Sequence, residues 1–125
     1  MVELVEKATC PLSRREISRI ISLCEPIVED LGIKYAIPSV IVVYDERSEE
    51  HYLNAGFIRV SEGVLVAYDV IAVKGNTLPI VFLEELATGL LAHSLLRTVG
   101  AVNLEDIEKL KSRVFFKLVI VMSRV

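Results

Sequence analysis

The chain has 125 residues, the usual length of one domain, and a chain of this length can bury well over half of its unfolded surface in one core. Hydrophobic residues make up 53% of the sequence, but 25% are charged and every 18-residue stretch contains charged or strongly polar side chains, so no membrane span is expected. The net charge of −3 comes without any cluster of basic residues, which argues against nucleic acid as a partner.

The large apolar fraction has to be covered by a tight core or by an interface, so we expect a homodimer or a complex with another protein. Glu3, Glu6 and Lys7 stand where a secretory signal would have a basic and then an apolar stretch, which predicts a cytoplasmic protein. Cys10 and Cys24 could pair, but without a CxxC or a Cys/His cluster we expect two buried or half-buried thiols. Trp and Gln are absent while Glu, Arg, Lys, Val and Ile are plentiful, which resembles the composition trend of thermophile proteins.

The first predicted element is a helix that begins after Ser13. Ser13 and Glu16 have the spacing of a capping box, and apolar residues follow at helical intervals until Gly32, which predicts the end of the helix. Pro26 lies inside this pattern. Because proline removes one backbone donor and crowds the preceding turn, we expect the helix to bend or split near Cys24.

Three segments rich in Val and Ile follow, at residues 40–44, 56–60 and 64–73, and they predict a small, mostly antiparallel, three-stranded sheet. The last two segments are joined tightly enough to form a hairpin. The stretch 46–54 is charged and is expected to be a solvated loop. His51 with Glu49 and Glu50 could hold a cation there, but polar residues in such a loop are usually solvated.

A long helix is predicted over residues 78–98, capped by Asn76 or Thr77 and ended by Gly100. Pro79 falls in its first turn, where a missing amide donor costs nothing. This helix is the structural centre of the predicted domain.

On a helical wheel, Glu84, Glu85 and Thr88 share the one polar sector of this helix, and apolar residues fill almost all of the rest. We therefore expect the helix to be covered on most sides. Glu84 and Glu85 are adjacent and point about 100° apart around the helix axis, so they cannot act as a facing acid–base pair. They are expected to form a wet stripe on the helix.

The last predicted helix is capped by Asn103 with Asp106, and its acidic first turn and basic later part suit the helix dipole. Residues 114–122 are almost continuously apolar and could form a strand, but continuation of the helix is favoured. The order of elements is helix, three strands, helix, helix, so residues 1–125 are expected to form a single α+β domain.

Within the long helix, residues 91–100 include His93, Ser94 and Arg97. This segment resembles the active-site helix of the zincin metallopeptidases, in particular the small gluzincin-like proteins, which carries H-E-x-x-H in an apolar frame. The order of elements also resembles a minimal zincin. The resemblance implies that His93 keeps the first metal ligand, that Ser94 replaces the general-base glutamate, and that Arg97 replaces the second histidine.

These replacements remove the chemistry of a zinc peptidase. The guanidinium of Arg97 stays protonated and has no lone pair for zinc, and Ser94 cannot serve as the base beside a metal-bound water. The resemblance therefore implies a protein that has lost its metal and its peptidase activity. It also makes Glu105 or Glu108 the counterpart of a third ligand, and either could instead form an ion pair with Arg97.

The competing interpretation is that His93 is a core histidine that makes one hydrogen bond. The sequence contains no G-x-G-x-x-G, no P-loop and no nucleophile elbow, so no cofactor and no catalytic residue are expected. We predict a non-catalytic protein-binding or assembly module that acts through apolar surface on the last helix. The alternative is a divergent metal-dependent hydrolase or peptidase with His93 as a metal ligand. The residues expected at the interface are Phe115, Phe116, Val119 and Met122.

Overall fold

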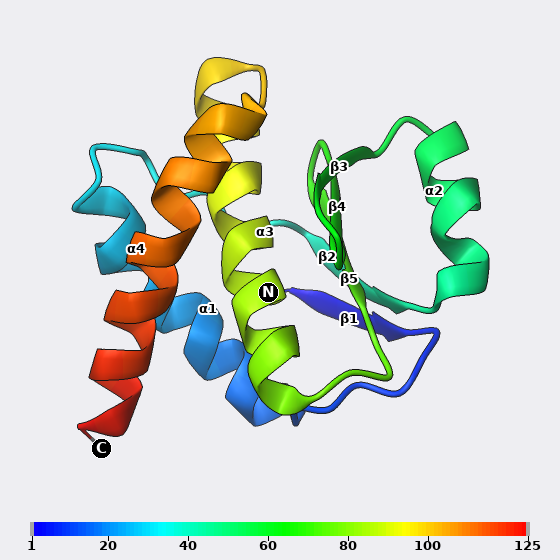
Figure 1. Cartoon of the computed structure of the whole chain (residues 1–125), viewed down its shortest axis with the longest axis horizontal. Coiled ribbons are helices and arrows are strands. Elements are labelled where there is room, and N and C mark those ends of the chain that lie inside the picture. The colour runs from blue at the N-terminus through cyan, green and yellow to red at the C-terminus, as the bar shows by residue number, and fades with distance from the viewer. Residues whose placement is uncertain (1, 125) are drawn as a thin grey trace.

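A mixed five-stranded sheet with helices on both faces forms the fold in the computed structural model, which describes residues 2–124 (Figure 1). Three long helices, α1 (Arg14–Glu29), α3 (Pro79–Val99) and α4 (Leu104–Ser123), lie on one face, and the short α2 (Glu49–Asn54) lies on the other. The strands follow the spatial order β1-β2-β5-β4-β3. Their bounds are Glu3–Glu6 (β1), Val40–Tyr44 (β2), Ile58–Ser61 (β3), Val64–Ala67 (β4) and Val70–Lys74 (β5).

The predicted α+β class is confirmed, but the three-stranded sheet was wrong. β1, β2 and β5 are parallel neighbours, whereas β4 pairs antiparallel with both β5 and β3. The segment predicted as one strand, 64–73, is divided into β4 and β5 by a tight turn in which Asp69 has a φ of +72°. Aspartate tolerates this left-handed conformation, so the turn carries no glycine to reveal it. β1 has only four residues and forms by parallel pairing with β2, which follows it in the chain after α1.

The stretch between β2 and β3 was predicted to be a solvated loop, but it forms a 3-10 turn (Glu46–Ser48) followed by α2. Asp45 caps the turn by accepting a hydrogen bond from the Ser48 amide at 3.2 Å. Tyr52 of α2 packs edge-on against Tyr44 and Phe57, with ring centroids 5.6 and 5.2 Å apart. This aromatic contact covers the second face of the sheet and orders a segment whose local sequence is mostly charged.

The first helix begins as predicted, with both bonds of the capping box present. The Glu16 amide donates to Ser13 Oγ at 3.1 Å, and the Ser13 amide donates to Glu16 Oε1 at 2.9 Å. Pro26 does not split the helix, which continues to Glu29. Cys24 and Val28 on either side of Pro26 are fully buried, and their packing outweighs one missing backbone hydrogen bond.

The central helix α3 lies where it was predicted, but its cap differs. Leu78 occupies the cap position without a side-chain hydrogen bond, while Asn76 Oδ1 accepts from the Thr9 amide at 3.3 Å. Gly89 faces the sheet so closely that a Cβ there would be 2.8 Å from an Ile71 methyl and 2.9 Å from a Val64 methyl. This small residue lets the helix lie directly on β4 and β5.

By length and composition α3 could cross a membrane, but 61% of its most apolar window is buried inside the fold. α1, α4 and the sheet all contact it. These contacts place α3 in the core of the fold.

The last helix is one continuous element, so the predicted helical continuation through residues 114–122 is confirmed. Asn103 Oδ1 caps it by accepting from the Glu105 amide at 2.9 Å. Ile107, Val114 and Leu118 form its buried stripe and join the main core between α1 and α3. Other side chains of α4 are exposed, among them Phe116 and Val119.

Candidate functional site

His93 and Ser94 hold the linker between α1 and β2 against the central helix. Both side chains are fully buried. Nδ1 of His93 lies 2.8 Å from the carbonyl oxygen of Ala36, and Ser94 Oγ accepts from the Ala36 amide at 3.0 Å while donating to the Leu90 carbonyl at 2.9 Å. These hydrogen bonds fix the linker to α3, as expected for a core histidine.

The tautomer of His93 follows from its partner. A carbonyl oxygen can only accept, so Nδ1 carries the proton and the lone pair lies on Nε2. Nε2 is buried and has no hydrogen-bond partner among the described residues. Burial is the main cause that lowers the pKa of His93, so the ring is held in its neutral form.

Arg97 leaves the end of α3 toward the turn between β4 and β5, away from Glu105 and Glu108. Its guanidinium lies 3.7 Å from Asp69 Oδ1 and stacks over the Tyr68 ring at 4.1 Å from the centroid. The ion pairs predicted with Glu105 or Glu108 are therefore not formed, and Glu108 pairs with Lys111 instead. The reason is topological, because the β4–β5 turn reaches the carboxyl end of α3.

The carboxylate of Asp69 also ties this turn to the start of β2. Ser39 donates to Asp69 through its hydroxyl and, at 3.2 Å, through its amide. The Ser39 hydroxyl is the largest cause that lowers the pKa of Asp69, and Arg97 lowers it further. Asp69 thus remains charged and accounts for the position of Arg97.

Within residues 2–124, no group of three or more His, Cys, Asp or Glu side chains is placed to hold a metal ion. His51, Glu49 and Glu50 lie on α2, and Glu49 pairs with Arg59 of β3 at 2.8 Å. The structure therefore does not bring the predicted loop residues together as a cation site.

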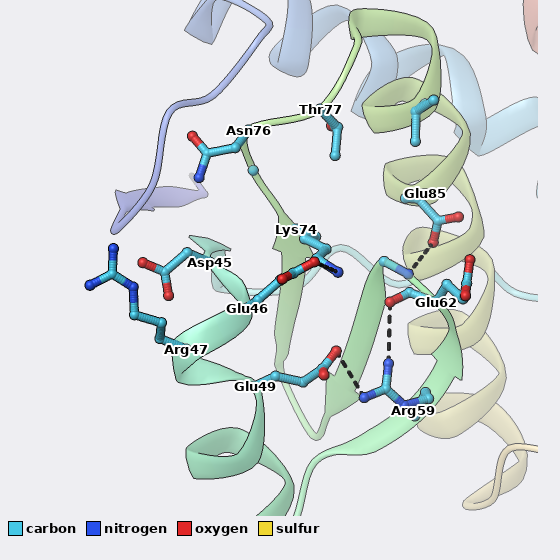
Figure 2. Close-up of a pocket in the computed structure, with 13 residues that line it drawn as sticks. Asp45, Glu46, Arg47, Glu49, Arg59, Glu62, Lys74, Asn76, Thr77 and Glu85 are labelled. Atoms are coloured by element: carbon cyan, nitrogen blue, oxygen red, sulfur yellow. Dashed lines mark hydrogen bonds and ion pairs between the residues drawn. The ribbon is translucent and has the colours of Figure 1, made fainter.

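A charged hollow of about 990 Å³ lies where the parallel strands β2 and β5 end (Figure 2). The carboxyl ends of parallel strands are a common place for ligands, because the loops that follow them diverge there. The start of β4 and the first turns of α3 close the other side. Its lining consists of Asp45, Glu46, Arg47, Glu49, Arg59, Glu62, Gly63, Lys74, Gly75, Asn76, Thr77, Val81 and Glu85.

Two ion pairs cross this charged hollow. Lys74 Nζ lies 3.0 Å from Glu46 Oε1, and Arg59 Nη2 lies 2.8 Å from Glu49 Oε1. Arg59 also donates through Nη1 to the Glu62 carbonyl at 3.2 Å (Figure 2). The half-buried cations of the hollow are therefore engaged by groups of the protein itself.

Glu85 reaches from α3 to the turn between β3 and β4 (Figure 2). Ser61 Oγ donates to its Oε1 at 3.0 Å, and the Gly63 amide donates to its Oε2 at 3.2 Å. Burial is the largest cause acting on this carboxyl and raises its pKa, although both hydrogen bonds act in the opposite direction. A Cβ at Gly63 would lie 2.9 Å from Glu85 Cγ, so glycine is needed for this close approach.

The wet stripe predicted for α3 is only partly right. Thr88 is buried and donates its hydroxyl to the Glu84 carbonyl at 2.8 Å. Glu84 and Glu85 are half-buried and do point to different sides, because Glu85 lines the charged hollow and Glu84 lines a second one on α4. The charged hollow was not predicted from the sequence, because its residues come from separate segments that the mixed sheet brings together.

The second, apolar hollow has a volume of about 540 Å³ and lies along α4. Phe116 is 66% exposed and Val119 is 37% exposed, whereas Phe115 and Met122 are half-buried against the core. Three of the four predicted interface residues line this hollow, and Met122 does not. Its lining residues are Glu84, Ser112, Arg113, Phe115, Phe116 and Val119.

No protein-family model matches this chain, and no curated protein or solved structure shows a significant match to it. Any proposal for function therefore rests on the geometry of the residues described above.

Proposed function

We propose that this protein is a non-catalytic assembly module that forms a homodimer through the apolar hollow on α4. The observation that carries the proposal is Phe116, a large aromatic side chain that is 66% exposed beside an apolar depression. Aromatic residues that fill a partner's pocket contribute much of the energy of protein interfaces. Phe116 and Val119 line the same hollow, and contiguous exposed apolar surface of this kind marks sites of protein interaction.

The charges at the rim of the apolar hollow favour a second copy as the occupant. Glu84 and Arg113 lie on the same rim and carry opposite charges. A two-fold axis brings one surface against itself, so a rim with both signs can place Glu84 of one chain against Arg113 of the other. Phe116 would enter the hollow of the second copy and fill the space next to Val119. We propose that this module works as a soluble protein of the cytoplasm.

We further propose that α3 corresponds to the metal-binding helix of a zincin and has lost its metal site. His93 and Arg97 have the i, i+4 spacing of paired ligands, but His93 and Ser94 now bind the linker at Ala36, and Arg97 binds Asp69. Related sequences with His, Glu and His at the three positions would support this descent, and apolar residues there would contradict it.

One observation favours a second candidate function, a divergent metal-dependent hydrolase or peptidase. Nε2 of His93 carries a lone pair and has no hydrogen-bond partner among residues 2–124, as a vacant ligand would. The ring is fully buried, however, and within residues 2–124 it belongs to no group of three or more His, Cys, Asp or Glu side chains that could hold a metal. Stoichiometric zinc in the purified protein that is lost on His93→Phe would establish this second function and overturn our preference.

The test of the dimer is size-exclusion chromatography with light scattering across a range of concentrations. We expect the wild type at twice the chain mass and Val119→Asp at the chain mass, because a carboxylate cannot be buried unpaired in an apolar interface. Leu53→Asp is the matched control: Leu53 is 38% exposed, against 37% for Val119, and lies on α2 across the sheet. A monomeric wild type, or equal behaviour of both variants, would contradict the proposal.

A further inference from the structure

The charged hollow is separate from the proposed dimer surface and has a chemistry of its own. Its lining holds five carboxylates and three cationic side chains, so its formal charge is −2 when all are ionised. A volume of about 990 Å³ accommodates a small molecule or a few residues of a peptide. The charge balance favours a cationic ligand over an anionic one.

The ion pairs between these side chains strengthen the preference for a cationic ligand. Lys74 and Arg59 are already in contact with Glu46 and Glu49, at 3.0 and 2.8 Å. The third cation, Arg47, lies at the outer side of the hollow, far from Glu85 (Figure 2). On the inner side of the hollow, where Lys74 and Arg59 lie, an anionic ligand would have to break an existing ion pair to gain a new one. A cationic ligand would find a carboxylate without a cationic partner.

Among the described residues, Asp45, Glu62 and Glu85 are the lining carboxylates that belong to no ion pair, and Glu85 is the one that hydrogen bonds from another element hold in a half-buried position. Both of its hydrogen-bond donors, Ser61 Oγ and the Gly63 amide, are neutral, and no Lys, Arg or His of the described chain lies within ion-pair distance. The two donors fix the carboxylate at the wall of the hollow, and its partial burial strengthens any new ion pair there. The site is thus rigid before a ligand arrives.

We propose that the charged hollow binds a ligand through an ammonium or guanidinium group that pairs with Glu85 Oε1 and Oε2. The cation enters between α3 and the β3–β4 turn, and the polar groups along β2 and β5 orient the remainder of the ligand. The same chemistry is offered by a free polyamine and by a basic side chain of a peptide.

The experiment is calorimetric titration of the full chain with four probes: spermidine, acetyl-arginine amide, its uncharged citrulline analogue, and acetyl-glutamate amide. We expect the cationic probes to bind, and the citrulline and glutamate probes to bind at least about tenfold more weakly, as for the loss of one charged hydrogen bond. Tighter binding of spermidine would identify a free polyamine as the source of the cation, and tighter binding of the arginine probe would identify a peptide.

Glu85→Gln keeps the shape of the side chain and should weaken the cationic probes at least about tenfold. Glu50→Gln removes the same charge from an exposed position on α2 outside the hollow and should leave the affinity unchanged. In the wild type, the amide resonance of Gly63 should shift as either cation is added, a readout that does not depend on the variant folding. Binding that leaves Gly63 unmoved, equal affinity for the citrulline probe, or no binding of either cation would overturn the proposal.

Discussion

Replacing His93 by phenylalanine should make the protein more resistant to acid without a large loss of stability at neutral pH. The variant loses the hydrogen bond from Nδ1 to the Ala36 carbonyl, which contributes about 0.5–1.5 kcal/mol. It also removes a buried Nε2 with no partner, and such an atom costs about 1–3 kcal/mol. Ser94 Oγ remains 3.4 Å from the same carbonyl. Together the two ranges place the stability of the variant at neutral pH from about 0.5 kcal/mol below to about 2.5 kcal/mol above that of the wild type, with a midpoint about 1 kcal/mol above it.

The pH dependence gives the sharper test. Burial lowers the pKa of His93 in the folded state, so the unfolded chain takes up a proton first as the pH falls. Well above the usual histidine pKa of about 6.5, the titration of His93 does not change the stability with pH, because the residue is neutral in both the folded and the unfolded chain. Below that pH it reduces stability by up to about 1.4 kcal/mol per unit, until the lowered folded pKa is reached. This decrease in stability toward acid must be absent from the phenylalanine variant, which has no titratable group at position 93.

Urea denaturation of both proteins at several pH values between about 5 and 8 measures this difference. Subtracting the two curves cancels the contributions of groups that do not act on His93, such as Glu85, which titrate in both proteins. We expect the difference in unfolding free energy to be flat above about pH 7 and to grow in favour of the variant toward pH 5. A difference that stays constant across the range would refute the neutral, buried histidine.

Two further predictions concern the packing of the core. Gly89→Ala should destabilise the fold by about 1–2 kcal/mol in urea denaturation, because overpacking against the stiff side chains of Ile71 and Val64 outweighs the gain in helix propensity. An unchanged midpoint would mean that the sheet yields to the new methyl group. Iodoacetamide should label half-buried Cys10 well before Cys24 in the native protein, since burial raises the pKa of Cys24 to about 12. Mass spectrometry follows the labelling, and equal native rates would contradict this order.

The two adjacent glutamates of α3 connect the helix to both proposed surfaces. Glu84 faces the apolar hollow beside Phe116, while Glu85 faces the charged hollow and the β3–β4 turn. Their separation follows from helix geometry alone and was predicted from the sequence. Their different surroundings were not, because α4 and the β3–β4 turn are placed by contacts between distant segments. A charge change at either residue should therefore affect one surface and spare the other.

Local signals in the sequence were enough to predict the three long helices and the helical conformation of residues 114–122. Each of these is specified by features within a few residues of one another: the capping box at Ser13, the proline and glycine that bracket α3, and the apolar spacing of all three. Local hydrogen bonds and a 3.6-residue period need no knowledge of the rest of the chain. For the same reason the exposed aromatic surface of α4 could be anticipated from its composition.

Contacts made in the folded chain set the number and order of the strands, the formation of α2, and the partners of the polar residues on α3. β1 exists because it pairs with β2, α2 is ordered by the packing of Tyr52, and Arg97 meets Asp69 because the β4–β5 turn ends beside it. The charged hollow depends in the same way on the parallel ends of β2 and β5 meeting the start of α3. Many of the contacts that place these residues join distant parts of the chain, since Ser61 and Glu85 are 24 positions apart and Ala36 and His93 are 57 positions apart. No periodicity within either segment encodes such a contact.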